Sequence, residues 1–223
     1  MRVLDLCAEP DVDLVPVVAH IRSGGLVAYP TETVYGIGGV CSIEASMRVR
    51  ELKGREEAKP LIALVPNRES VGELEWTPEA VELAETFWPG SLTLVLRDPN
   101  GLFPDSVRDS DRKTVAVRES PHSLVSHLVR NLGQPLTSTS LNRSGEPAIT
   151  TGAAAREFLV RLDVKDIWLI DGGSLPPSLP STIVDCTTAP PSVLREGAIP
   201  AERLRRIIEE ADGSVEYPES RNN

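Results

Sequence analysis

Hydrophobic and polar positions alternate along the chain with two different periods, and the change from one to the other predicts an α/β or α+β fold. Apolar residues at helical spacing predict helices over 12–21, 42–52, 77–88, 123–132, 153–162 and 201–211. Short apolar or alternating runs predict strands over 3–6, 26–29, 61–65, 92–97, 114–118, 167–170, 180–185 and 193–197. Because this periodicity continues almost to the end of the 223 residues, we expect one domain over 1–211 and a polar tail over 212–223.

Two segments rich in hydroxyl groups interrupt this pattern. The segment 30–36 places two threonines, a glutamate and a tyrosine directly after a buried strand, and we expect it to form a turn. Loops at the carboxyl ends of strands are where open α/β sheets bind ligands. The segment 135–145 is too dense in serine and threonine for an ordinary core strand. We expect it to be either a loop that binds phosphate, ribose or a polar substrate, or an exposed Ser/Thr turn.

A basic segment lies at 53–61 in a chain whose formal net charge is −10. It holds Lys53, Arg55 and Lys59 between a glycine and a proline. Arginine offers phosphate a planar fork of donors, and lysine offers a mobile point charge. The segment therefore favours binding of an anion, with phosphate as the first candidate. The alternative is a solvated helix end whose cations lie near the negative pole of the helix.

Composition and the remaining motifs disfavour several classes of function. The acidic net charge and the aromatic content of 4% oppose nonspecific binding of nucleic acid. Neither Cys-x-x-Cys nor His-Glu-x-x-His spacing occurs, so we expect no disulfide framework, no metal ligands, and cysteines that are buried or idle. A P-loop and a Gly-x-Ser-x-Gly elbow are also absent from the sequence. The cations and hydroxyls that remain suit a reaction in which the protein orients its substrates and neutralises phosphate charge.

The first residues bear on the compartment. Asp5 comes too early for the core of a signal peptide, and no apolar run approaches membrane-spanning length. We therefore expect a cytoplasmic protein with no membrane partner.

Six sequence blocks, in this order and spanning roughly residues 10 to 200, resemble those of the YrdC family of threonylcarbamoyl-AMP synthases. The blocks are Pro30-Thr31-Glu32-Thr33-Val34-Tyr35-Gly36, Lys53-Gly54-Arg55 with Lys59-Pro60-Leu61, Trp88-Pro89-Gly90-Ser91-Leu92-Thr93, Ser138-Thr139-Ser140-Leu141-Asn142-Arg143-Ser144-Gly145, Pro180-Ser181-Thr182-Ile183-Val184-Asp185 and Arg195-Glu196-Gly197.

The resemblance implies an open, twisted, mixed sheet with flanking helices around a large basic cleft. It also implies a nucleotidyltransferase reaction in which L-threonine, bicarbonate and ATP give L-threonylcarbamoyl-AMP and pyrophosphate, with Mg²⁺ on the phosphates. A tRNA threonylcarbamoyl transferase complex would then pass the group to the adenosine next to the anticodon. The resemblance also implies tRNA or double-stranded RNA as a further partner.

Carried over position by position, the resemblance assigns residues to the two main substrates. Lys53 and Arg55 would be catalytic. The ATP site would be formed by Lys53, Arg55, Lys59, Thr114, Ser140, Asn142 and Arg195. The threonine site would be formed by Thr31, Tyr35, Arg118, Ser138 and Ser181. Within that site, Arg118 would bind the carboxylate, because a fork of donors suits a carboxylate.

Three positions depart from the family pattern. Leu64 stands where many members have a histidine, Leu141 replaces the small central residue of a Ser-Ala-Asn block, and Ser120 replaces a proline. The length resembles that of the short, single-domain form of the family. Leu64 and Leu141 motivate a second hypothesis, a family paralogue that acts as an RNA-binding or ribosome-associated module. Carbamoyl transfer in hydrogenase maturation is a third hypothesis, but it uses a related domain inside much larger chains.

Overall fold

The computed structural model describes residues 1–8, 13–54 and 61–211. Six helices occur in this part of the chain: α1 (Val15–Arg22), α2 (Ile43–Lys53), α3 (Pro78–Phe87), α4 (Ser123–Leu132), α5 (Gly152–Arg161) and α6 (Ala201–Ala211). The strands are β1 (Arg2–Asp5), β2 (Leu26–Pro30), β3 (Tyr35–Gly38), β4 (Ile62–Leu64), β5 (Leu92–Arg97), β6 (Thr114–Arg118), β7 (Leu136–Ser140), β8 (Ile167–Asp171), β9 (Thr182–Asp185) and β10 (Ser192–Arg195).

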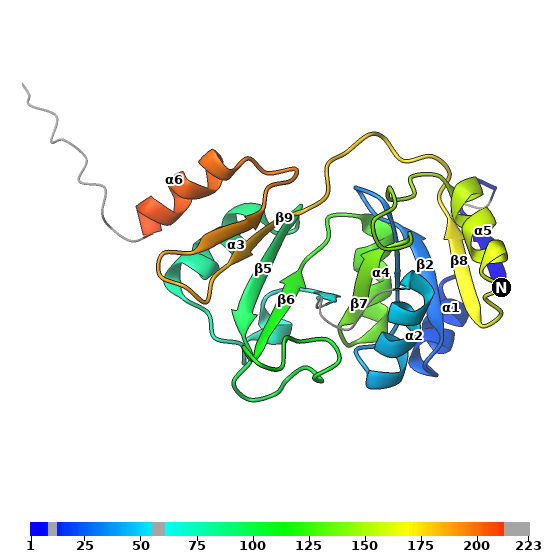
Figure 1. Ribbon diagram of the computed structural model, residues 1–223, viewed down its shortest axis with the longest axis horizontal. Coiled ribbons are helices and arrows are strands. Elements are labelled where there is room, and N and C mark those ends of the chain that lie inside the picture. Colours follow the sequence, from blue (N-terminus) through cyan, green and yellow to red (C-terminus); the bar gives the residue numbers. More distant parts are fainter. Residues whose placement is uncertain (9–12, 55–60, 212–223) are drawn as a thin grey trace, which may run out of the picture.

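All of these strands join one mixed sheet in the order β1-β8-β2-β3-β7-β4-β6-β5-β9-β10 (Figure 1). Helices α1 and α4 pack on one face of the β8-β2-β7 region, and α2 and α5 pack on the other. Helices α3 and α6 cover the β5-β9 end, where they form a separate part of the core. The predicted fold class, a mixed α/β sheet with flanking helices, is confirmed.

The sheet is strongly twisted, and this twist brings together residues that a flat sheet would separate. Successive pairings from β2 through β3, β7 and β4 make β6 run opposite to β2. In a flat sheet the carboxyl ends of β2 and β6 would therefore lie at opposite edges. Glu32, which follows β2, nevertheless forms an ion pair with Arg118, the last residue of β6. A twist of roughly 20–25° per strand, about 90° over the four steps from β2 to β6, brings these two ends closer than they would lie in a flat sheet.

Local sequence signals account for several element ends. Ser42 and Thr77 cap α2 and α3, because their hydroxyl oxygens accept hydrogen bonds from the first-turn backbone N–H groups. Gly54 and Gly133 end α2 and α4 with φ values of 56° and 72°, which glycine adopts without strain. The helix ranges expected from the sequence, 42–52, 77–88 and 123–132, agree with these ends to within one or two residues.

Two expected loops are strands instead. The segment expected to be a turn with glycines contains β3, and the segment expected to be a hydroxyl-rich loop contains β7, which lies in the middle of the sheet. Gly38 allows this pairing, because a Cβ atom there would lie 1.6 Å from the carbonyl oxygen of Thr137. The buried Thr137 hydroxyl is also satisfied, since it donates to the Gly39 carbonyl oxygen and accepts from the Gly39 N–H. Hydroxyl side chains thus fit a core strand once each has a partner.

The burial of some side chains is not evident from the local sequence. The polar segment 99–111 is irregular, yet Phe103 and Val107 within it are buried in the core. Cys186 is buried, Cys41 is partly buried and Cys7 is exposed, so whether the Cys7 thiol is idle stays a prediction. Within the ranges that the structure describes, no helix is long and apolar enough to span a membrane.

Candidate active site

The first part of the site forms where α2 ends against β7. Lys53 is the last residue of α2, and the αL glycine that follows it turns the chain away. The Lys53 side chain is buried, and its Nζ donates hydrogen bonds to Asn142 Oδ1 at 2.7 Å and to the carbonyl oxygens of Asn142 and Ser140. The Ser140 hydroxyl donates to Asn142 Oδ1 at 2.7 Å. The structure therefore brings together Lys53, Ser140 and Asn142, three of the residues predicted to form the ATP site.

The second part surrounds Arg118 at the end of β6. Its Nε donates to the Gly90 carbonyl oxygen at 2.9 Å, and its Nη2 contacts Glu32 Oε1. Glu32 Oε2 accepts a hydrogen bond from the Ser120 hydroxyl at 2.9 Å. The Arg118 side chain is 7% exposed and that of Glu32 is 21% exposed, so the pair is largely withdrawn from water but still reached by it.

The third part lies at the start of β9. Arg195 donates to the Ser181 carbonyl oxygen through Nη2 at 2.7 Å and through Nε at 3.2 Å. The Ser181 hydroxyl lies 2.9 Å from the Thr93 hydroxyl on β5. Ser181 is 3% exposed, so its hydroxyl is held by the protein at a fixed position. Ser181 and Arg195, predicted for the threonine and ATP sites respectively, are therefore in direct contact.

Electrostatic interactions connect these parts. Burial lowers the pKa of Arg118 to about 10, with the nearby Arg195 acting in the same direction and Tyr29 opposing it. The ion pair with Glu32 favours the charged form, and a pKa near 10 leaves the guanidinium cationic at pH 7. Burial also lowers the pKa of Arg195. Burial raises the pKa of Tyr29, which is neutral and donates its hydroxyl proton to Ser138 Oγ at 2.8 Å.

Two of the predicted residues, Thr31 and Tyr35, donate their hydroxyl protons to backbone carbonyl oxygens. A third, Thr114, has no side-chain hydrogen bond among the described contacts. The Thr31 hydroxyl donates to the Val34 carbonyl oxygen at 2.7 Å and thereby closes the turn after β2. The Tyr35 hydroxyl donates to the Gly173 carbonyl oxygen at 2.9 Å, and burial raises its pKa to about 12. Thr114 is buried at the start of β6. Whether these three contact a substrate stays a prediction.

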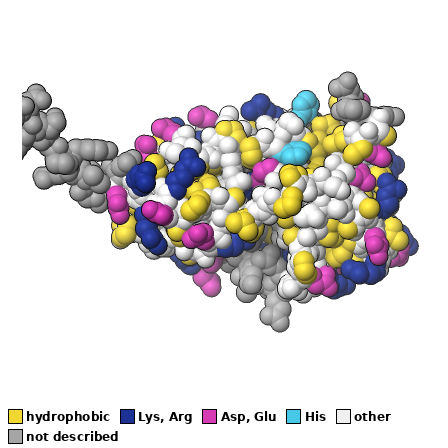
Figure 2. Space-filling view, turned by 90° about the horizontal axis from the view of Figure 1, so that it is seen from above, with side chains coloured by type: hydrophobic (Ala, Val, Ile, Leu, Met, Phe, Trp, Pro, Cys, Tyr) yellow, Lys and Arg dark blue, Asp and Glu magenta, His cyan; other side chains and the backbone are white. Residues whose placement is uncertain are grey.

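Arg55 and Lys59 lie outside the described residues, so their assignment to the ATP phosphates also stays a prediction. The same holds for the large basic cleft, to which both would contribute. On the face shown in Figure 2, cationic and anionic side chains are interspersed and form no extended patch of a single sign.

The sequence did not single out the residues that surround Arg118. Glu32 was noted only as part of a turn, although it is the carboxylate that pairs with the predicted ligand of the threonine carboxylate. Ser120 was noted as a departure from the family, yet it donates a hydrogen bond to Glu32. An acid between two threonines after a buried strand is the signal that could have indicated this site.

Leu64 and Leu141, the two departures that motivated the RNA-binding hypothesis, are core residues. They are 4% and 1% exposed, and they pack into two different parts of the core. Leu64 pairs in register with Arg118 on the neighbouring strand, so its side chain supports the strand that carries the arginine. Both leucines therefore have a packing role in this chain.

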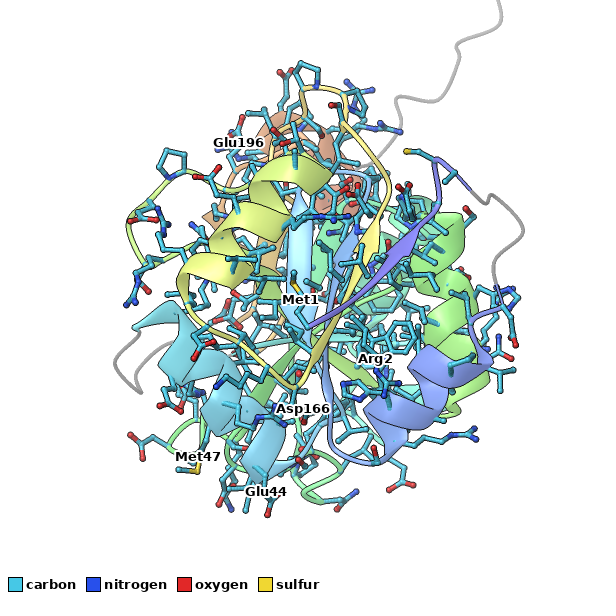
Figure 3. All side chains as sticks on the ribbon, turned by 90° about the vertical axis from the view of Figure 1, so that its right-hand side faces the viewer. Met1, Arg2, Glu44, Met47, Asp166 and Glu196 are labelled. Carbon is cyan, nitrogen blue, oxygen red and sulfur yellow. The ribbon has the colours of Figure 1, made fainter. Side chains whose placement is uncertain are left out.

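Two pockets are defined by described residues. One of about 310 Å³ is lined by Arg48, Leu52 and Arg143 among others, and it borders the first part of the site, because Leu52 and Arg143 adjoin Lys53 and Asn142 in the sequence. In Figure 3, Asp166, the ion-pair partner of Arg48, lies in the lower half of the view, and Glu196, which follows Arg195, lies near its upper end. The other pocket, of about 610 Å³, lies between α1 and α4. No group of three or more His, Cys, Asp or Glu side chains suited to a metal occurs among the residues of known placement.

Comparisons with known proteins define the family. Residues 19–197 match the Sua5, YciO and YrdC family, described as "Telomere recombination". The chain is 39% identical over 194 residues to a Pyrococcus abyssi protein named threonylcarbamoyl-AMP synthase, covering 85% of this chain and 55% of that protein. A Neisseria gonorrhoeae protein of the same name is 33% identical over 172 residues, covering 76% of this chain and 88% of that protein.

A solved structure shares the fold over almost the whole chain. The structure of P. abyssi Sua5 complexed with L-threonine matches with a TM-score of 0.82 and 33% identity, covering 94% of this chain and 61% of that one. The chain thus spans little more than half the length of its archaeal relative. The match over residues 19–197 agrees with the resemblance seen in the sequence blocks, and the chain belongs to the Sua5, YciO and YrdC family.

Proposed function

We propose that this chain is an L-threonylcarbamoyladenylate synthase, a nucleotidyltransferase that uses L-threonine, bicarbonate and ATP. The observation that carries the proposal is Arg118, a buried cationic side chain surrounded by Glu32, Ser91 and Ser120. Its environment suits a small polar ligand that bears a carboxylate. The names of the two relatives and the L-threonine bound to the structural relative support the same substrate.

The proposed reaction forms two bonds in succession. The α-ammonium group of threonine first gives a proton to solvent, and the free amine then attacks the carbon of bicarbonate, which gives a carbamate and releases water. A carbamate oxygen then attacks the α-phosphorus of ATP, the bond to the β-phosphate oxygen breaks, and pyrophosphate leaves. Neither step needs a nucleophile from the protein, so the protein contributes by aligning the substrates and stabilising negative charge.

The residues of the site divide between these tasks. Arg118 binds the threonine carboxylate, with Ser138 and Ser181 in the same pocket and Thr31 and Tyr35 at its margin. Arg195, Ser140, Asn142 and Thr114 face the nucleotide, and Lys53, Arg55 and Lys59 stabilise its phosphates. Mg²⁺ belongs to the substrate in this proposal, because ATP brings it as the MgATP complex.

The product is a reactive mixed anhydride, so a second protein must consume it. We propose a tRNA threonylcarbamoyl transferase complex as that partner and the cytoplasm as the compartment. Direct contact of this chain with tRNA or double-stranded RNA is a separate possibility, to be measured by the salt dependence of binding.

Pyrophosphate release tests the proposal. MgATP is incubated with the protein in bicarbonate buffer, with L-threonine, with L-serine or with neither. We expect release that requires both threonine and bicarbonate, and an Arg55→Ala variant about 10²-fold slower, by analogy with the loss of an oxyanion donor. Threonine-independent release, or none from folded protein, would contradict the proposed function.

A further inference from the structure

Glu32 is an unusual neighbour for a residue that binds a carboxylate. Its Oε1 atom contacts Arg118 Nη2, and its Oε2 atom accepts a hydrogen bond from the Ser120 hydroxyl. Ser120 is 5% exposed, so the protein holds the Glu32 carboxylate from its buried side. The Ser91 hydroxyl also lies 3.5 Å from Glu32 Oε1. The Glu32 side chain is 21% exposed, and the two oxygens of a carboxylate can together accept about four hydrogen bonds, so there is capacity for a further donor.

Arg118 is only partly used by this arrangement. Its Nε is bound to the Gly90 carbonyl oxygen, and its Nη2 is bound to Glu32, with Ser91 Oγ at 3.5 Å. Among the described residues, none accepts a hydrogen bond from Arg118 Nη1. One arm of the guanidinium can therefore receive a carboxylate while the other arm keeps its contact with Glu32.

An α-amino acid carries a carboxylate and an ammonium group on the same carbon atom. Adjacent positive and negative groups in a partly desolvated site match this arrangement of charges. We infer that Glu32 and Arg118 together bind the zwitterion of the substrate, with Arg118 Nη1 on its α-carboxylate and the Glu32 carboxylate on its α-ammonium group. This inference rests on the proposed function and assigns to Glu32 the selection of ligands with an amino group.

The same contact has a second interpretation with the opposite consequence. Glu32 could occupy the place of the substrate carboxylate and leave when threonine arrives. Removal of the Glu32 charge would then strengthen threonine binding, because a competitor is lost. In the zwitterion arrangement, removal of the charge weakens threonine binding, because the ammonium group loses its partner. The direction of the change therefore separates the two interpretations.

The experiment compares two ligands by calorimetry without ATP: L-threonine, and the analogue with a hydroxyl in place of the α-amino group. For the wild-type chain, we expect the analogue to bind at least ~10-fold more weakly, since hydrogen bonds to charged groups contribute about 1.5–3 kcal/mol. In Glu32→Gln, threonine should bind at least ~10-fold more weakly than to the wild type, and the preference over the analogue should fall to about threefold or less.

The control is Glu119→Gln, which removes a carboxylate next to Arg118 in sequence. Among the described contacts, Arg118 has no ion pair with Glu119, so this variant should keep the wild-type preference. Glu32→Asp keeps the charge on a shorter side chain and should retain part of the preference. Thermal unfolding of each variant shows whether it is folded, and glutamine can still accept the hydrogen bonds from Arg118 and Ser120.

Each outcome decides between the alternatives. A preference for threonine that is unchanged in Glu32→Gln, or tighter threonine binding by that variant, would overturn the role of Glu32. Threonine-dependent pyrophosphate release by the wild type would in that case leave the proposed function standing. A wild-type chain that binds neither ligand and releases no pyrophosphate would overturn both.

Discussion

Replacement of Arg118 by alanine should have two effects that can be measured separately: weaker threonine binding and a lower free energy of unfolding. The side chain is 7% exposed and makes two kinds of contact within the protein, one with the Gly90 carbonyl oxygen and one with Glu32. Alanine removes both, and it also removes the group that we propose for the threonine carboxylate. The variant therefore reports on structure and on binding together, and a matched control is needed to separate them.

The structure gives the expected magnitudes. Breaking a buried ion pair costs about 3–5 kcal/mol, and Glu32 is exposed enough to regain some water, so we expect about 3 kcal/mol in the free energy of unfolding. A charged hydrogen bond to the ligand contributes about 1.5–3 kcal/mol, which corresponds to a ~10- to 150-fold increase in the KM for threonine. The KM for ATP should change much less.

Arg112→Ala is the control, because Arg112 forms another arginine–carboxylate pair in the same half of the sheet. Its Nη2 lies 2.6 Å from Oδ2 of the buried Asp185. Urea unfolding should show that both variants are less stable than the wild type, whereas steady-state kinetics should show an altered threonine KM only for Arg118→Ala. Equal effects of Arg118→Ala on the KM values of threonine and ATP would refute the assignment.

Three further predictions concern other parts of the chain. Lys53→Met leaves the oxygens of Asn142 without their buried ammonium donor and should lower the free energy of unfolding by about 2–4 kcal/mol, measured by urea titration. A loss below ~0.5 kcal/mol would show that these hydrogen bonds contribute little to stability. Burial lowers the pKa of His122, so the unfolded state binds more protons than the folded state just below pH 6.5. The stability of the wild type should therefore fall as the pH is lowered through this range, and thermal unfolding of His122→Asn should show a smaller loss of stability. At pH 8, iodoacetamide should label the exposed Cys7 before Cys186, whose pKa burial raises to about 12, as mass spectrometry of peptides can establish; equal rates would contradict the burial of Cys186.

The sequence predicted most elements because their signals are local. Hydroxyl caps at Ser42 and Thr77, and glycines after α2 and α4, fix helix ends through contacts within a few residues. Strands such as β2 and β5 can be predicted from runs of apolar residues, which are buried on both faces of the sheet.

The strands β3 and β7 were missed because their stability comes from distant partners. Gly36 pairs with Ser140, and the Thr137 hydroxyl is satisfied by the backbone of Gly39. The partners Gly36 and Gly39 lie far from β7 in the sequence, and the local pattern of β7 alone is that of a polar segment. Propensity and periodicity describe a residue's neighbours in sequence, whereas a central strand depends on its neighbours in the sheet.

The candidate site shows the same division. The cations Lys53, Arg118 and Arg195 were recognised by type and by the family resemblance. Lys53 and Arg118 are buried, whereas Arg195 is exposed at the end of β10. The partnership of Arg118 with Glu32 was not visible, because the two residues are 86 positions apart and come from the ends of strands that are not neighbours in the sheet.

The identity of the product tests the central claim most directly. The protein is incubated with MgATP, L-threonine and ¹³C-labelled bicarbonate, and the nucleotides are analysed by mass spectrometry. The account predicts an adenylate whose mass contains threonine and one labelled carbon, and which is absent when threonine is omitted. Pyrophosphate or AMP without such an adenylate, even when the mixture is analysed within seconds, would contradict it.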